Sequence, residues 1–115
     1  MRRGEIRLVD FEPVRGSGAN KRRPAVIVSN DRANTTAVRL ARGVLTVVPL
    51  TGNASVIYPF QVLLPAAGTG LRHDSKAQAE QVRSVDLDRV GRILGRVPAD
   101  SLSALDDALR LQLTL

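Results

Sequence analysis

Alternating apolar and polar residues open the chain, and this pattern predicts a half-buried strand over residues 4–11. Further strands are predicted where apolar or β-branched runs are bounded by turn-forming residues. These runs occupy residues 25–29, 43–51, 59–64, 71–85 and 91–97. From residue 98 onward, Leu recurs at three- or four-residue intervals, which predicts an amphipathic helix that packs on the sheet. The expected fold is therefore mainly β with α (α+β): a small, curled antiparallel sheet or SH3-like barrel with a C-terminal helix.

Prolines refine two of these strands. Pro24 fixes φ and lacks a backbone N–H, so it is predicted to be the first residue of its strand and to hold Arg23 in an extended conformation at the strand's mouth. Pro49 lies near the end of the next long run, so the last residues there, including Thr51, are predicted to leave the sheet. Polar residues 29–37 predict a strand end or helix cap, then at most one short helical turn or an irregular excursion.

Length and composition limit the organisation of the chain. Its 115 residues, 43% of them hydrophobic, predict a single domain over residues 1–115 with no internal repeat. The chain has no cysteine, which excludes disulfides and thiolate metal sites and makes the cytoplasm the expected compartment. No apolar segment follows the N-terminal arginines and none approaches the length of a membrane span, so neither secretion nor membrane insertion is expected.

The charge of the chain points to an anionic partner. There are 17 Lys and Arg against 11 Asp and Glu, and only Lys21 and Lys76 are lysines. Guanidinium groups suit bidentate phosphate contacts, so nucleic acid is a candidate partner. An arginine-rich solvated surface explains the charge equally well. Phe11, Tyr58 and Phe60 are the only aromatic residues, which argues against a platform that stacks several bases.

The inventory of reactive groups leaves few chemistries open. The chain has no glycine-rich phosphate-binding motif, and its one histidine cannot form a two-histidine zinc motif, so no cofactor and no metal are expected. Chemistry by arginine, hydroxyls and carboxylates remains. His73 is a candidate general acid or base, although a lone loop histidine is more often a surface residue. Gln78, Glu80 and Gln81 are candidates for contacting bases, in a strand expected to bend or bulge near Glu80.

Six segments of the chain, taken in order, resemble the MazF/PemK toxin endoribonucleases. They are Arg-Arg-Gly-Glu-Ile (2–6), Val-Asp-Phe-Glu-Pro-Val-Arg-Gly-Ser (9–17), Arg-Pro-Ala-Val-Ile-Val-Ser-Asn-Asp (23–31), Val-Val-Pro-Leu-Thr (47–51), Tyr-Pro-Phe-Gln-Val-Leu-Leu (58–64) and Ala-Glu-Gln-Val-Arg-Ser-Val (79–85). The resemblance implies a CcdB/PemK-like barrel, a homodimer and metal-independent, sequence-specific cleavage of single-stranded RNA. It also implies the toxin component of a type II toxin-antitoxin system, whose cognate antitoxin covers the RNA groove with a disordered tail.

The resemblance also implies roles for individual residues. Arg23 matches the catalytic arginine before the proline, and Thr51 matches the catalytic threonine at the end of its strand. In the implied reaction, the 2′-hydroxyl beside the scissile phosphate attacks it and leaves a 2′,3′-cyclic phosphate and a 5′-hydroxyl. The positions implied to contact RNA are Ser17, Lys21 and Arg22 for backbone phosphates, and Glu80 and Gln81 for bases.

Three questions stay open at the level of sequence. Many family members carry a Glu after the first Gly-Ser, where this chain has Gly18, so proton transfer is unassigned among Glu80, Asp10 and His73. Glu80 and Gln81 can instead satisfy backbone groups at a strand end. The function has two alternatives: a CcdB-like toxin that inhibits a topoisomerase without cutting RNA, and an RNA-binding module without catalysis. The Arg-Pro strand start and Thr51 favour the nuclease.

Overall fold

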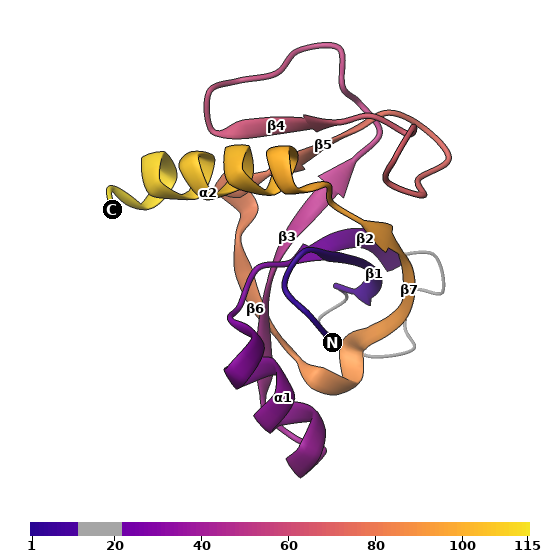
Figure 1. Ribbon diagram of the computed structural model, residues 1–115, viewed down its shortest axis with the longest axis vertical. Coiled ribbons are helices and arrows are strands. Elements are labelled where there is room, and N and C mark those ends of the chain that lie inside the picture. Colours follow the sequence, from indigo (N-terminus) through magenta and orange to yellow (C-terminus); the bar gives the residue numbers. More distant parts are fainter. Residues whose placement is uncertain (12–21) are drawn as a thin grey trace.

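The computed structural model describes residues 1–11 and 22–115, which form one curled antiparallel sheet with a helix on it (Figure 1). The strands are β1 (Glu5–Asp10), β2 (Arg22–Ile27), β3 (Val44–Thr51), β4 (Gln61–Leu64), β5 (Ser75–Gln78), β6 (Arg83–Asp86) and β7 (Val90–Arg96). Their order is β4-β5-β3-β2-β1-β7, and β6 pairs with β3 off this path. The predicted α+β sheet is confirmed. The described strands do not close into a barrel, because the order ends at β4 on one side and at β7 on the other.

The sheet carries a hydrophobic cluster on each face, because successive side chains of a strand point to opposite sides. One cluster includes Ile6, Val26, Val48 and Leu50 and is covered by helix α2 (Ala99–Leu113), as predicted. Leu105 in this helix is fully buried, whereas Leu113 is half exposed. The other cluster, inside the curl of the sheet, includes Val9, Ala25, Ile27 and Val47.

The sequence underestimated helix α1 (Asp31–Leu40), which is ten residues long rather than one turn. Its N-terminus is capped by Asn30, whose Oδ1 accepts a hydrogen bond from the Ala33 backbone N–H at 2.8 Å. Fully buried Asn34 ties the helix to the segment that joins it to β2, by donating to the Ser29 carbonyl at 2.9 Å. The sequence predicted at most one turn because the segment is polar, but polar contacts stabilise this helix in place of an apolar stripe.

No helix in the described part of the chain is long and apolar enough to cross a membrane.

Two strand boundaries differ from the predictions made around the prolines. β2 begins at Arg22, so Pro24 is not its first residue; Pro24 pairs with Leu8 of β1, and the register with β3 starts only at Ala25. The missing N–H of Pro24 therefore interrupts no pairing with β3. The end of β3 does not leave the sheet either. On the edge of β3 away from β2, the strand pairs first with β6 and then, at Leu50 and Thr51, with β5.

The predicted bend in residues 71–85 is confirmed, and its form is a 3₁₀ turn, η1 (Ala79–Gln81), rather than a bulge. This turn separates β5 from β6, and both of these strands pair with β3. A second 3₁₀ turn, η2 (Leu87–Arg89), lies between β6 and β7. The path of the chain through η1 therefore places Glu80 and Gln81 beside the end of β3, where Thr51 lies.

Candidate functional site

The register of β2 and β3 brings Arg23 and Thr51 together. Ala25 is paired with Pro49, and the register continued by two residues places Arg23 opposite Thr51. Paired residues of an antiparallel sheet share a face, so both side chains lie on the same side of the sheet. A hydrogen bond supports this placement, because Arg23 Nη2 donates to the carbonyl oxygen of Leu50, the residue before Thr51, at 3.1 Å. The two residues assigned to catalysis thus converge from separate strands.

The guanidinium of Arg23 is held by neutral groups only. Besides the Leu50 carbonyl, its Nη2 contacts Oε1 of Gln78 in β5 at 3.3 Å. Within residues 1–11 and 22–115, Arg23 forms no ion pair, and its Nε and Nη1 have no hydrogen-bond acceptor. The side chain is exposed. This arrangement leaves a positioned and uncompensated cation, with free donors that match the oxygens of a phosphate.

Thr51 presents a partly buried hydroxyl at the end of β3. Its Oγ1 accepts a hydrogen bond from the backbone N–H of Asn53 at 3.3 Å, which orients the side chain. In the described part of the chain, the hydroxyl hydrogen of Thr51 has no acceptor. The hydroxyl can therefore donate to an oxygen of a ligand that sits on Arg23.

Two further residues on this face were not singled out from the sequence. Lys76 is paired with Thr51, is only 8% exposed, and donates from Nζ to the Val56 carbonyl at 2.8 Å. The same Nζ lies 5.6 Å from the centre of the Tyr58 ring, a cation–π contact. Buried Gln61 pairs with Gln78, and its Oε1 accepts from the Tyr58 N–H at 3.1 Å. Lys76 and Gln61 therefore hold the loop that follows Thr51 against the face that carries Arg23 and Thr51. Period-two alternation in β5, which puts Lys76 and Gln78 on one face, was the signal that could have found Lys76.

Glu80 is linked to this face through Gln61, and Gln81 is not. Glu80 Oε2 accepts a hydrogen bond from Gln61 Nε2 at 2.7 Å, and its Oε1 is buried without a partner in the described residues. Gln81 is exposed on η1. Neither side chain bonds to a backbone group within the described ranges, so neither has the strand-end role considered as an alternative.

Other predicted residues are separated from Arg23 and Thr51. Arg22 is exposed, and alternation along β2 turns it to the opposite face from Arg23, where it pairs with Asp10. Asp10 in turn lies 4.0 Å from Arg89 Nη1. His73 lines a cavity that reaches Pro24, on that same opposite face. Ser17, Gly18 and Lys21 lie outside the described residues. Among residues 1–11 and 22–115, no three His, Cys, Asp or Glu side chains are grouped so that they could hold a metal ion.

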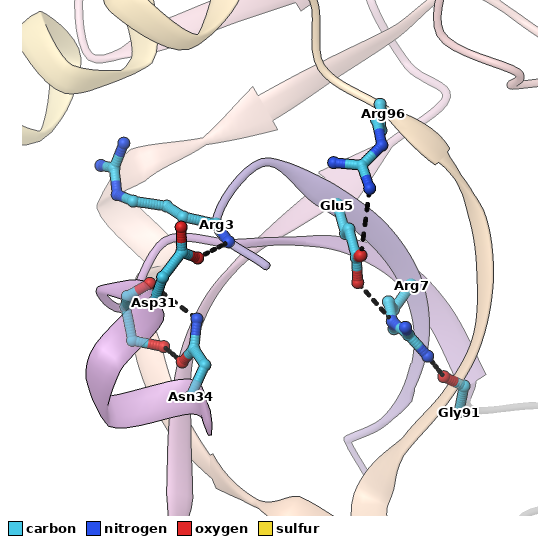
Figure 2. Close-up of polar contacts among 8 residues, drawn as sticks. Arg3, Glu5, Arg7, Asp31, Asn34, Gly91 and Arg96 are labelled. Carbon is cyan, nitrogen blue, oxygen red and sulfur yellow. Dashed lines mark hydrogen bonds and ion pairs between the residues drawn. The ribbon is translucent and has the colours of Figure 1, made fainter. Parts of the chain in front are cut away.

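A second arginine cluster, at the β1–β7 boundary, has a different electrostatic character (Figure 2). Glu5, only 5% exposed, accepts from Arg7 Nε at 2.9 Å and lies 3.4 Å from Arg96 Nη2. Arg7 also donates from Nη1 to the Gly91 carbonyl at 3.1 Å. Burial acts to raise the pKa of Glu5, but the hydrogen bond from Arg7 and the nearby positive charges outweigh it and hold this pKa below its ordinary value. Here a carboxylate compensates the arginines.

Known proteins resemble this chain along nearly its whole length. Residues 2–113 match the family described as PemK-like, MazF-like toxin of type II toxin-antitoxin system. The chain is 63% identical over 115 residues to endoribonuclease MazF9 of Mycobacterium tuberculosis, covering 100% of this chain and 98% of that protein. It is 34% identical over 113 residues to endoribonuclease MazF6 of the same species, covering 98% and 96%.

Solved structures share the fold. MazF from Deinococcus radiodurans superposes with a TM-score of 0.78 at 29% identity, covering 100% of this chain and 97% of that one. A mycobacterial endoribonuclease in complex with its cognate antitoxin gives a TM-score of 0.79 at 23% identity, with coverage of 100% and 96%. A MazE–MazF complex from Deinococcus radiodurans gives 0.76 at 27% identity, with the same coverage.

Proposed function

We propose that Arg23 and Thr51 bind the scissile phosphate of single-stranded RNA in the reaction that this chain catalyses. The chain belongs to the PemK-like, MazF-like toxins of type II toxin-antitoxin systems and is an endoribonuclease. One observation carries this assignment. The guanidinium of Arg23 is positioned by the Leu50 carbonyl and Gln78, has no carboxylate partner among the described residues, and lies next to Thr51. Such a group offers preorganised positive charge where negative charge develops in the transition state.

The proposed reaction is an in-line displacement at phosphorus. The 2′-oxygen forms a bond to phosphorus, the bond from phosphorus to the 5′-oxygen breaks, and the products are a 2′,3′-cyclic phosphate and a 5′-hydroxyl. The 2′-hydroxyl loses a proton and the leaving 5′-oxygen gains one. Arg23 stabilises two phosphoryl oxygens, and Thr51 orients the phosphate through its O–H. No metal is required in this scheme.

Proton transfer has three candidates, and position favours one. Asp10 and His73 lie toward the face of β2 opposite to Arg23. Glu80 is hydrogen-bonded to Gln61, which shares the face of Arg23 and Thr51 by register. Glu80 is therefore the carboxylate connected to the face of Arg23 and Thr51, and proton transfer is assigned to it.

RNA binding outside the scissile phosphate extends beyond this face, because Arg22 turns to the opposite face of β2. Glu80 and Gln81 contact bases, whereas Arg22, with Ser17 and Lys21, contacts backbone phosphates. Cleavage is specific for a short sequence in messenger RNA, with ribosomal and transfer RNA as further possible substrates. The loop that Lys76 and Gln61 hold in place shapes the groove for those bases.

The proposed assembly is a cytoplasmic homodimer of single-domain chains, inhibited by a cognate antitoxin. Solved antitoxin complexes of structurally similar toxins support such a partner, whose disordered tail would occupy the RNA groove. The exposed Leu111, Leu113 and Leu115 at the end of α2 support an apolar contact with a second copy. The absence of cysteine from the sequence is consistent with a reducing cytoplasm.

Incubation of the purified protein with a long single-stranded RNA in EDTA tests this function. New 5′-hydroxyl ends and 2′,3′-cyclic phosphates at recurrent short sequences are the expected result. Intact RNA together with inhibited DNA supercoiling would favour a topoisomerase-inhibiting toxin instead. RNA affinity that falls with salt, without any new ends, would favour a non-catalytic RNA-binding module.

A further inference from the structure

A cavity of about 450 Å³ lies between β7 and the loop before β5, and it is lined in part by two arginines. Its walls are apolar and include Leu8, Leu71 and Ile93, while Arg72, His73 and Arg92 contribute polar groups. Among the residues that the structure describes, no carboxylate lines the cavity. The volume falls within the range of roughly 300 to 1,000 Å³ that is common for small-ligand sites, which also combine apolar walls with a few polar groups.

The two arginines at the cavity have no counter-charge in the described residues. Arg72 and Arg92 are exposed, and neither forms an ion pair or a side-chain hydrogen bond within residues 1–11 and 22–115. Arg96, farther along β7 than Arg92, instead reaches the carboxylate of Glu5 at 3.4 Å. Strand β7 thus carries Arg96, which is paired with a carboxylate, and Arg92, which lines an apolar cavity and has no counter-charge among the described residues.

The wall of the cavity is built tightly into the fold. Gly70 has φ of +87°, and a Cβ at this position would lie 2.8 Å from the Leu94 carbonyl oxygen. A Cβ on Gly95 would collide with the carbonyl oxygen of Thr69, which accepts the Arg96 N–H at 3.0 Å. Buried Thr69 also donates to the Pro65 carbonyl at 2.7 Å. The loop leading to Arg72 and His73 is therefore fixed against β7 before any ligand arrives.

We propose that this cavity binds a nucleotide unit, with Arg72 and Arg92 on its phosphate and the apolar walls against its ribose and base. It is a separate site from the scissile phosphate, because Pro24, which lines the cavity, and Arg23 project to opposite faces of β2. The choice of a nucleotide rests on the activity of the chain on RNA. The unit comes from one of two sources: a distal part of the RNA strand, or a free mononucleotide.

The test measures binding rather than cleavage, so that it is independent of Arg23. The probes are adenosine 5′-monophosphate and two RNAs made uncleavable by deoxyribose at the mapped cleavage position. The short RNA covers only the cleaved bond and its neighbours, and the long RNA extends on both sides. The variants are R72Q combined with R92Q, and I93E, which adds a carboxylate to the cavity wall. Arg32→Gln on α1 is the matched control, because Arg32 is also exposed and unpaired among the described residues.

Neutralising both arginines is expected to weaken the binding of one probe by about tenfold or more. For RNA, the slope of log affinity against log salt concentration is expected to fall in magnitude by about two. I93E is expected to weaken the same probe. A loss for the long RNA alone identifies the strand as the source, and a loss for the monophosphate identifies a free nucleotide. Two results would overturn the proposal. In the first, the variants do not change monophosphate binding, or the monophosphate does not bind at all, and the long RNA loses no more affinity than the short one. In the second, every loss of affinity matches that of Arg32→Gln.

Unchanged thermal melting of the variants confirms that binding, and not folding, was altered. The proposed function fails by a different observation, namely cleavage that survives the substitution Arg23→Ala. That outcome would leave the binding results at the cavity unchanged, so the two failures are distinguishable.

Discussion

Two arginine sites in this protein differ in what faces the guanidinium. At the β1–β7 boundary, the buried carboxylate of Glu5 contacts both Arg7 and Arg96 (Figure 2). On the face proposed for catalysis, the acceptors that Arg23 meets among the described residues are a carbonyl and the amide of Gln78. Both arrangements fix the position of an arginine. Only the second leaves its charge available to a phosphate, so the nature of the acceptor distinguishes the two arginine sites.

The largest expected effect comes from removing the uncompensated cation. Arg23→Ala should lower kcat for RNA cleavage by about 10³-fold, equivalent to about 4 kcal/mol, because the developing charge on the phosphoryl oxygens loses its partner. Single-turnover cleavage of a mapped RNA measures the loss. Arg7→Ala is the matched control: it should lower stability while cleavage per folded molecule stays near the parent value. Equal losses of activity in both variants would erase the distinction between the two sites.

Thr51 tests whether the catalytic face depends on its hydroxyl as well as on charge. Thr51→Val keeps the shape of the side chain and should reduce kcat by about 10²-fold, since one hydrogen-bond donor to the phosphate is lost. Thr51→Ser should retain most of the activity. Thr46→Val on the same strand serves as the control for folding. If valine and serine at position 51 cleave RNA equally well, the hydroxyl has no catalytic role.

Substitutions in the cluster of Glu5, Arg7 and Arg96 should change stability rather than activity. Glu5→Gln should lower the free energy of unfolding by about 2 kcal/mol at neutral pH, because charged hydrogen bonds to Arg7 and Arg96 are lost. The pKa of Glu5 is lowered by folding, so this stabilisation is present above the ordinary pKa and disappears as pH falls through the folded pKa.

Denaturant titrations of the Glu5→Gln variant and its parent, repeated across the acid range, check the sign of this effect. The difference in free energy between the two proteins should be largest near neutral pH and should shrink on acidification. A difference that grows as pH falls would contradict the assignment of Glu5 as the ionised centre of the cluster.

The smallest effect is expected from a substitution that gives Arg23 a carboxylate partner. Gln78→Glu places a carboxylate on the guanidinium of Arg23, as Glu5 does for Arg7, and should reduce kcat by about tenfold, or about 1.4 kcal/mol, by competing with the phosphate. Gln112→Glu, at an exposed position on α2, controls for the change in net charge. If both variants cleave RNA at the same rate, compensation of Arg23 does not matter for catalysis.

The candidate site was predictable where its signals are local. Arg23 stands before a proline and a β-branched run, and Thr51 ends a strand, so each could be recognised from its neighbours in the sequence. Lys76 was missed because its role depends on pairing with Thr51 and on contact with Val56, across a long separation in the chain. Helix α1 was underestimated because an Asn cap and a buried Asn stabilise it in place of an apolar stripe.

The sequence by itself determined the strands, the C-terminal helix and the resemblance to a toxin family, because alternation, turn residues and motif order are properties of neighbouring residues. It did not determine which of many arginines would be free to act. That was decided by the tertiary structure, through strand register. β1 and β7 bring a carboxylate to Arg7 and Arg96, whereas within residues 1–11 and 22–115 the acceptors brought to Arg23 are neutral. The physical reason is that charge compensation acts over a few ångströms in space, and residues that close are often far apart in the chain.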